Sequence, residues 1–370
     1  CLRRCGRIAP RVDCGPNSPR PSPNATAACR NSNPVRLLHL RRPLSLVALL
    51  LAALPVLAAE STETERQYLS GRGPADAIAW DLTVSAGRRA GEAAKLPVPS
   101  HWELHGFGAY HYGQQPNKSD EHGLYRTRFT VPAAWKDRRV RLVFDGAMTD
   151  TRVTVNGRAA GPVHQGGFTR FRYDITPLLK FGPGTASENV LEVDVAKVSA
   201  DPDTERGERY ADYWVFGGLY RAVWLEALPA QAIEHVAIDA RADGSFAADV
   251  TLSLTRNADR VEAQVLAADG TPFGAAFSTP LPGGGSGRVQ LAARLGAPRP
   301  WTAETPHLYT VRLALRRGDE TLHTLTQRFG FRTFEVRDGQ GLYLNGQRIL
   351  LKGVNRHSFR PATGRALTRE

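Results

Sequence analysis

Short runs in which apolar and polar residues alternate recur along most of this 370-residue chain. Residues 140–144 read Val-Arg-Leu-Val-Phe, and residues 151–155 alternate in the same way before Asn156-Gly157. Strict alternation predicts a half-buried strand, and Asn-Gly predicts a hairpin turn because both residues accept a positive φ. Long apolar stripes at helical spacing are nearly absent. The pattern therefore predicts a mainly β protein.

The β pattern falls into two sandwiches and a shorter third segment. Residues 60–228 contain alternating runs separated by Gly, Pro, Asn and Asp, which predict a jelly-roll sandwich. Residues 229–333 contain strands roughly ten residues apart, which predict an immunoglobulin-like sandwich. Residues 334–370 contain a second Asn-Gly hairpin and an apolar strand that ends in polar side chains. We interpret this segment as the first strand of a truncated TIM barrel, unfolded or loosely docked without its neighbouring strands.

The N-terminal segment differs from the rest in composition. Residues 1–35 are rich in Pro, Arg, Asn and Ser without apolar periodicity, so we interpret them as a disordered or non-native leader. Residues 36–59 have the pattern of a signal peptide, with basic residues first, an apolar run over 44–57 and small residues near Ala59. We therefore expect a secreted or periplasmic protein with no stable membrane span after cleavage. An N-terminal anchor helix is the alternative.

The net charge of +12 is concentrated near the N-terminus. Residues 1–59 hold nine basic residues and one acidic residue, which leaves only +4 for residues 60–370. Binding to a nucleic-acid backbone needs a clustered basic face, so we expect no nucleic-acid partner. All four cysteines lie within the first 29 residues without CxxC spacing, and we predict no metal site in this chain.

Six short motifs occur in a fixed order along residues 60–370. They are Leu-Pro-Val-Pro-Ser-His-Trp-Glu at 96–103, Gly-Leu-Tyr-Arg at 123–126, Val-Asn-Gly at 155–157, Gly-Gly-Phe at 166–168, Tyr-Trp-Val-Phe-Gly-Gly-Leu-Tyr-Arg at 213–221 and Gly-Val-Asn-Arg-His at 353–357. In this order and at these distances the motifs resemble glycoside hydrolase family 2, which includes β-galactosidases, β-glucuronidases and β-mannosidases.

The resemblance implies a jelly-roll sugar-binding domain, an immunoglobulin-like domain and a TIM barrel that carries the chemistry. Family members hydrolyse terminal β-glycosides with retention, and two glutamates act as acid/base and nucleophile. Both glutamates lie on later barrel strands, and neither Glu335 nor Glu370 has the family's Asn-Glu context. The chain is therefore expected to be the N-terminal part of a secreted, β-galactosidase-like exo-β-glycosidase. We expect it to hold no catalytic residue and to be inactive alone.

The resemblance also implies five substrate-binding residues, which are Asp212, Trp214, Asn355, Arg356 and His357. Asp212 would contact the sugar, Arg356 would brace the carboxylates at the pocket floor, and His357 would hydrogen-bond the sugar ring. Each has a plainer alternative. Asp212 could form salt bridges to nearby arginines, Trp214 could lie in the sandwich core, and residues 355–357 could form a solvated loop.

Other residues of these motifs are predicted to be structural. Trp102 and Phe216 are expected in the core, Gly217-Gly218 should allow close sheet packing, and residues 110–112 should form an exposed loop.

The expected partner is a β-linked oligosaccharide or glycoside, and a homo-oligomer is one form that we consider for the complete protein. The resemblance implies sodium or magnesium only in the complete enzyme, and no cofactor is assigned to this chain. A secreted carbohydrate-binding protein without catalysis is the main alternative. A structural adhesin built of β sandwiches is a third.

Overall fold

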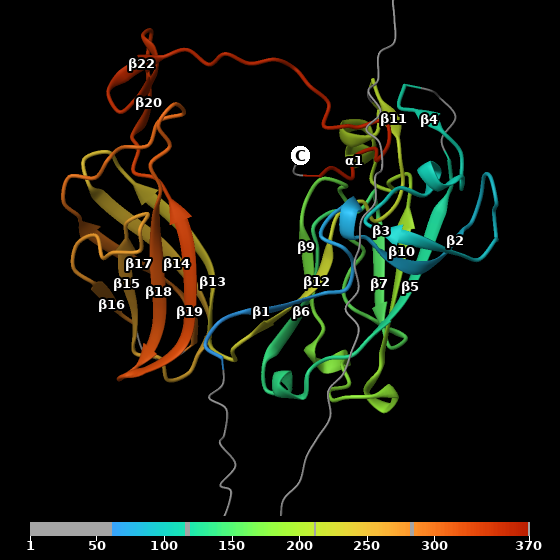
Figure 1. Cartoon of the computed structure of the whole chain (residues 1–370), viewed down its shortest axis with the longest axis horizontal. Coiled ribbons are helices and arrows are strands. Elements are labelled where there is room, and N and C mark those ends of the chain that lie inside the picture. Colours follow the sequence, from blue (N-terminus) through green and yellow to red (C-terminus); the bar gives the residue numbers. More distant parts are fainter. Residues whose placement is uncertain (1–60, 115–118, 211, 282–284, 369–370) are drawn as a thin grey trace, which may run out of the picture. The chain divides into compact units, whose positions relative to one another are not determined.

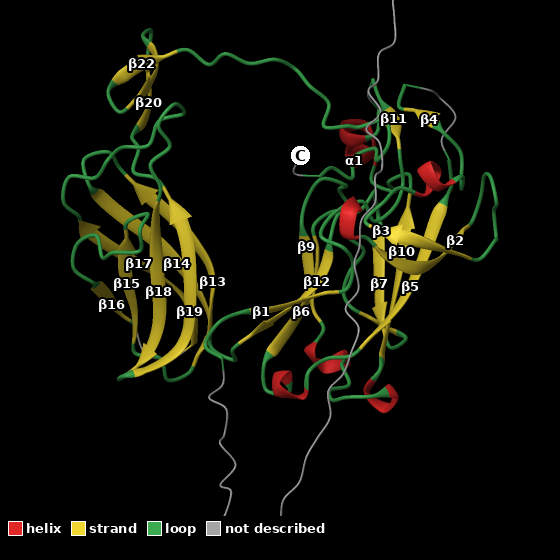
Figure 2. Cartoon of the chain, in the orientation of Figure 1, coloured by secondary structure: helices red, strands yellow, loops and turns green. Residues whose placement is uncertain are grey.

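The computed structural model describes residues 61–114, 119–210, 212–281 and 285–368 (Figure 1). The predicted leader and signal peptide, residues 1–59, lie outside the described residues, so their interpretation stays a prediction. Antiparallel strands make up most of the regular structure (Figure 2), which confirms the prediction of a mainly β fold. Within the described part of the chain, no helix has the length and apolar character needed to span a membrane.

The first sandwich consists of two antiparallel sheets around one core. Its four-stranded sheet has the order β1 (Glu65–Tyr68), β12 (Val223–Leu228), β6 (Arg139–Phe144) and β9 (Phe171–Asp174). Its six-stranded sheet has the order β3 (Ala94–Val98), β2 (Ile78–Val84), β5 (His122–Phe129), β10 (Asn189–Ala196), β7 (Thr151–Val155) and β8 (Arg158–Ala159). Buried residues from both sheets, among them Trp80, Tyr125, Phe144 and Leu225, form a single hydrophobic cluster.

The strands of this sandwich follow the alternation seen in the sequence. In β10 the side chains of Leu191, Val193 and Val195 are fully buried, and the residues between them are half-buried. This is the period-two burial that a strand with one core-facing side requires. The predicted Asn-Gly turn joins β7 to β8, where Asn156 and Gly157 have φ angles of 53° and 76°.

Short elements complete the first sandwich. The helix α1 (Pro202–Glu208) begins at Asp201, whose Oδ1 accepts a hydrogen bond from the backbone N of Thr204 at 2.7 Å. An Asp at this position satisfies a backbone N–H that the helix itself leaves without a partner. The short strands β4 (His111–Tyr112) and β11 (Trp214–Val215) pair at the upper end of this sandwich in Figure 1. The 3-10 helices are η1 (Pro74–Asp76), η2 (Trp102–His105), η3 (Ala133–Trp135), η4 (Thr176–Leu178) and η5 (Thr185–Ser187).

The second sandwich also has two antiparallel sheets. One has the order β13 (Ala232–Ala240), β14 (Ser245–Thr255) and β17 (Gly285–Arg294). The other has the order β16 (Phe277–Pro280), β15 (Arg260–Leu266), β18 (Tyr309–Arg317) and β19 (Glu320–Phe329). Phe246, Val265, Leu313 and Phe331 are buried in its core. The arrangement confirms the predicted immunoglobulin-like sandwich.

The C-terminal segment begins with a small antiparallel sheet and ends in a packed loop. The sheet has the order β20 (Phe334–Arg337), β21 (Gly341–Leu344) and β22 (Gln347–Ile349), and its second turn contains the predicted Asn345-Gly346. Residues 350–358 form no strand, and their side chains are exposed. By contrast, residues 359–366 pack against the first sandwich, whereas the whole segment was predicted to be unfolded or loosely docked.

Candidate functional site

The strands β4 and β11 pair at one end of the first sandwich. Residues 110–113 and 212–217, which include this pair, are called the rim. Trp214 lies opposite Tyr112 and Val215 lies opposite His111, and the backbone N of Gly113 donates to the carbonyl of Tyr213 at 2.9 Å. The expectation that residues 110–112 form an exposed loop was therefore wrong for His111 and Tyr112, which form a strand, whereas Tyr110 lies outside the strand and is 44% exposed. Their backbone partner stands about a hundred residues further along the chain, and no local pattern reveals such a pairing.

Trp214 stands on the surface of this rim. Its side chain is 45% exposed, and it meets Tyr110 and Tyr112 edge to face at centroid distances of 5.9 and 5.4 Å. The alternative that Trp214 belongs to the core is wrong, whereas the predicted core positions of Trp102 and Phe216 are confirmed. The exposed indole face, fixed by two tyrosines, is a surface on which the C–H groups of a sugar ring can stack.

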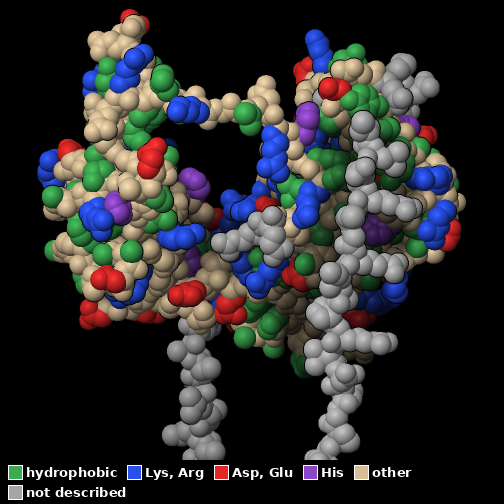
Figure 3. All heavy atoms as spheres, turned by 45° about the horizontal axis from the view of Figure 1, so that its top comes forward, with side chains coloured by type: hydrophobic (Ala, Val, Ile, Leu, Met, Phe, Trp, Pro, Cys, Tyr) green, Lys and Arg blue, Asp and Glu red, His purple; other side chains and the backbone are tan. Residues whose placement is uncertain are grey.

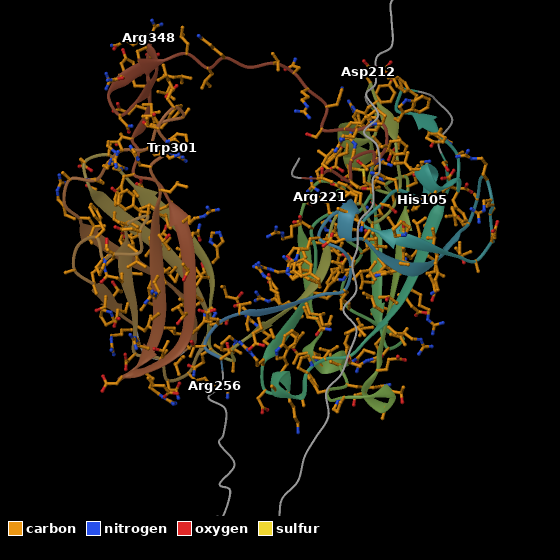
Figure 4. The ribbon with its side chains drawn as sticks, in the orientation of Figure 1. His105, Asp212, Arg221, Arg256, Trp301 and Arg348 are labelled. Carbon is orange, nitrogen blue, oxygen red and sulfur yellow. The ribbon has the colours of Figure 1, made fainter. Side chains whose placement is uncertain are left out.

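Asp212 lies beside this aromatic surface (Figure 4). Its carboxylate is exposed and accepts a hydrogen bond from the hydroxyl of Tyr112, which raises the pKa of that tyrosine. Two of the arginines considered as salt-bridge partners bind elsewhere. Arg209 donates to the carbonyls of Lys197 and Phe216, and Arg221 donates to the carbonyl of Asp145. The carboxylate of Asp212 is thus oriented by a neutral donor and still open to solvent.

The predicted triplet at 355–357 reaches the same end of the first sandwich through His357. The His357 ring lies 5.5 Å from the ring of Tyr213, next to Asp212 in sequence. Asn355 and Arg356 are exposed, and they do not join this contact. The structure thus brings His357 beside Tyr213, the residue between Asp212 and Trp214, and the binding roles predicted for all five residues stay predictions.

A buried ionic cluster beneath the rim was not predicted from the sequence. Nζ of Lys197 lies 2.8 Å from Oε1 of Glu103 and 3.1 Å from Oε2 of Glu121, and all three side chains are at most 1% exposed. Both oxygens of Glu121 are further bound, Oε1 by the backbone N of Ala109 at 2.7 Å and Oε2 by Nε1 of Trp102 at 3.2 Å. The three charged residues come from separate segments, so no spacing rule could have found them.

Charged side chains on the surface are arranged differently from those of the buried cluster. On the face shown in Figure 3, Lys and Arg side chains are interspersed with Asp and Glu. Exposed pairs such as Lys95 with Asp81 and Arg241 with Asp239 contribute little to stability, because water screens them. The buried cluster of Glu103, Lys197 and Glu121 lacks this screening, so removal of one partner lowers the free energy of unfolding far more.

The buried cluster and its neighbour His101 hold the backbone of the rim. Oε1 of Glu103 accepts a hydrogen bond from the backbone N of Gly217 at 2.9 Å, and Nδ1 of His101 lies 2.7 Å from the carbonyl of the same residue. Arg209, itself buried, donates to the carbonyl of Phe216 at 2.8 Å. The residues that follow Trp214 are thus fixed by polar side chains in the interior.

Burial changes the titration of two of these groups. It raises the pKa of Glu103 to about 7, against the opposing effect of the Lys197 ammonium. Oε2 of Glu103 has no hydrogen-bond partner within the described structure, which fits a carboxyl that protonates easily. Burial also lowers the pKa of His101 to about 3, so this ring is neutral at physiological pH.

Glu103→Gln is expected to change how stability depends on pH. A carboxyl whose folded pKa is raised binds more protons in the folded state, so its contribution to stability falls as pH rises from its ordinary value of 4.5 to about 7. The fall amounts to about 3 kcal/mol at most and ends above that range. Urea unfolding at several pH values should show the variant gaining stability relative to the wild type across this window. A constant difference from pH 5 to pH 8 would contradict the assignment.

The resemblance implies sodium or magnesium only in the complete enzyme. Among the residues that the structure describes, no three His, Cys, Asp or Glu side chains come together in a way that could hold a metal ion. Asp212 offers a single carboxylate that already accepts from Tyr112.

Three family models match consecutive parts of the chain. The model of the sugar binding domain of glycosyl hydrolases family 2 matches residues 85–229, the model named glycosyl hydrolases family 2 matches residues 231–332, and the model of the family's TIM barrel domain matches residues 334–370. The chain belongs to glycoside hydrolase family 2.

Individual relatives agree with this assignment. The β-galactosidase of Priestia megaterium is 30% identical over 302 residues, which are 74% of this chain and 28% of the relative. The β-galactosidase of Klebsiella pneumoniae is 32% identical over 337 residues, which are 82% of this chain and 30% of the relative. The chain thus spans about three tenths of the length of these curated relatives.

Solved structures share the fold. The β-glucuronidase of Bacteroides uniformis superposes with a TM-score of 0.64 at 24% identity, over 82% of this chain and 37% of that one. A β-glucuronidase of Ruminococcus gnavus, in complex with D-glucaro-d-lactam, superposes with a TM-score of 0.61 at 20% identity, over 82% of this chain and 52% of that one.

Proposed function

We propose that this chain supplies the two accessory domains and the start of the catalytic barrel of a retaining exo-β-glycosidase. The observation that carries the proposal is the rim, where Asp212 and Trp214 stand exposed on a buried polar support and His357 lies beside Tyr213. A carboxylate, an indole face and an imidazole are the groups that bind sugar hydroxyls and the apolar face of a pyranose.

In this proposal the described residues bind and orient the terminal sugar. Asp212 accepts hydrogen bonds from sugar hydroxyls, and Tyr112 keeps its carboxylate turned outward. Trp214 covers one face of the ring or of the adjoining group. The acid/base and nucleophilic glutamates of a retaining mechanism would come from later barrel strands, so this chain alone should not hydrolyse glycosides.

Asp212→Asn in the complete protein is expected to lower kcat/KM by about 10- to 100-fold, because a hydrogen bond to a charged group is worth roughly 1.5–3 kcal/mol. Steady-state hydrolysis of p-nitrophenyl β-glycosides measures this change. Asp81→Asn is the matched control, because Asp81 is also exposed and forms a surface ion pair with Lys95. Equal kcat/KM for the wild type and Asp212→Asn would refute the sugar contact.

The substrate and the location of the complete protein are further parts of the proposal. Relatives named β-galactosidase and β-glucuronidase favour a β-galactoside or a β-glucuronide, and a panel of the two p-nitrophenyl glycosides distinguishes them. The signal-like pattern of residues 36–59 supports a secreted or periplasmic enzyme. A homo-oligomer stays an expectation for the complete protein.

A non-catalytic carbohydrate-binding protein is the second candidate. The exposed Trp214 with Tyr110 and Tyr112 could bind a saccharide without any catalytic glutamate. Isothermal titration of this 370-residue chain with galactose- and glucuronate-containing disaccharides tests it. Saturable binding without hydrolysis by the complete protein would favour this candidate over the glycosidase.

A further inference from the structure

His101 lies at a junction between the rim and the segment that follows His357. Its ring is 0% exposed, with Nδ1 2.7 Å from the carbonyl oxygen of Gly217 and Nε2 3.1 Å from the backbone N of Arg365. A backbone N–H can only donate, so Nε2 accepts and the proton sits on Nδ1, which donates to Gly217. The neutral ring therefore has both nitrogens satisfied, by two segments about 150 residues apart.

The faces and the edge of the His101 ring are also enclosed. Phe216 and Tyr220 lie 5.0 and 5.5 Å from it, the latter stacked at 12°. Gly364 approaches the ring edge so closely that a Cβ added there would stand 2.7 Å from Cδ2 of His101. Gly364 also has a φ of 61°, so a glycine is required here for both space and backbone conformation.

The segment from Phe359 to Ala366 makes three further contacts with the first sandwich. The ring of Phe359 stacks on Phe216 at 5.8 Å and 3°. The guanidinium of Arg365 lies 4.2 Å from the ring centroid of Tyr213, and Ala366 is only 2% exposed. His357 stands two residues before Phe359, so the position of this segment determines where His357 lies relative to Asp212.

We propose that His101 is a positioning residue that ties the rim at 212–217 to the segment at 359–366, and thereby aligns Asp212 and Trp214 with His357. The kinetic part of this inference rests on the proposed function. The tie itself does not, because it consists of contacts within this chain. His101 touches neither the sugar nor the reacting atoms in this proposal, and it acts through the two backbone groups that it joins.

Hydrogen exchange on the 370-residue chain tests the tie. His101→Phe keeps an aromatic ring of similar shape but leaves the carbonyl of Gly217 and the N–H of Arg365 without partners. The Arg365 amide is expected to exchange about tenfold faster in this variant, while amides in β10 keep their rates. Gly364→Ala should have the same effect from the other side of the contact, because its Cβ would stand 2.7 Å from Cδ2 of His101 while the imidazole itself is kept.

Gly91→Ala is the matched control for the second variant. Gly91 also has a positive φ, of 76°, but a Cβ there would meet nothing within 4 Å. It reproduces the backbone strain of Gly364→Ala without displacing the His101 ring. Wild-type exchange at Arg365 in both His101→Phe and Gly364→Ala would overturn the tie.

Kinetics of the complete protein test the positioning role. His101→Phe and Gly364→Ala are expected to raise KM about tenfold, because misplaced sugar contacts weaken binding in every folded molecule. A purely structural role would lower the amount of active protein, and thus the apparent kcat, at unchanged KM. Faster exchange with unchanged KM would therefore overturn the positioning role. A wild-type protein that hydrolyses no β-glycoside would refute the proposed function. Hydrogen exchange alone would then test whether His101 joins the rim to residues 359–366.

Discussion

Gly217→Ala is expected to lower the free energy of unfolding of the first sandwich by about 3 kcal/mol. A Cβ at this position would lie 2.0 Å from Cζ2 of Trp102, a side chain that is 0% exposed. Trp102 has no room to move away, because Nε1 donates to Glu121 and Gly123 borders another part of the ring system. Urea unfolding followed by tryptophan fluorescence should show a clearly lower midpoint.

Gly207→Ala is the control for this substitution. Gly207 lies in α1 with a negative φ, and a Cβ there would meet nothing within 4 Å. Alanine is the better helix former by about 1 kcal/mol, so this variant should be as stable as the wild type or slightly more stable. Equal midpoints for Gly217→Ala and the wild type would show that the packing around Trp102 is looser than described.

Lys197→Met is expected to destabilise the first sandwich by about 3–5 kcal/mol near pH 8, where the partner carboxyl of Glu103 is ionised. Methionine matches the length of the lysine side chain but offers no charge, so Glu103 and Glu121 would remain buried without their shared cation. The penalty should be smaller near pH 5, because Glu103 is then protonated. Unfolding midpoints at the two pH values measure both effects.

Two further variants separate the lost charge from lost packing. Lys95→Met removes an ion pair whose two side chains are 70% and 60% exposed, and its effect should stay below about 1 kcal/mol. Adding Glu103→Gln to Lys197→Met should recover part of the stability at pH 8, since it removes one unpaired charge. A Lys197→Met protein within 1 kcal/mol of the wild type at pH 8 would contradict the role of the buried cluster.

Local patterns were sufficient to predict several of the strands and two of the turns of this fold. Period-two alternation appears in the burial of β10, and both Asn-Gly pairs, Asn156-Gly157 and Asn345-Gly346, form the expected turns. These features depend on neighbouring residues and on the φ angles that Asn and Gly accept, so a short window of sequence contains them. The close packing predicted at Gly217 is likewise confirmed by Trp102.

Contacts between distant segments could not be predicted from the sequence. The pairing of β4 with β11 joins residues about a hundred positions apart, and the buried cluster joins Glu103, Glu121 and Lys197 from three separate segments. A charged residue in a sequence is most simply interpreted as a surface residue, because burial of a charge is costly unless a partner compensates it. Only the fold shows that the partner exists.

The candidate site was predicted in outline by resemblance. Asp212 and Trp214 lie exposed at the rim, and His357 contacts Tyr213 between them. The support of the rim by Glu103 and His101 could not be predicted, because it depends on the depth at which these residues lie in the sandwich. The binding roles of Asp212, Trp214, Asn355, Arg356 and His357 stay predictions.

The most direct test of the central claim is to read the coding sequence that follows Glu370. A retaining family 2 glycosidase predicts a continuing open reading frame that completes a TIM barrel of about 250 residues, with an Asn-Glu pair at the end of one strand and a second glutamate at the end of a later one. A stop codon shortly after Glu370, or a barrel without these two glutamates, would contradict the account and leave a protein that binds sugar without cleaving it.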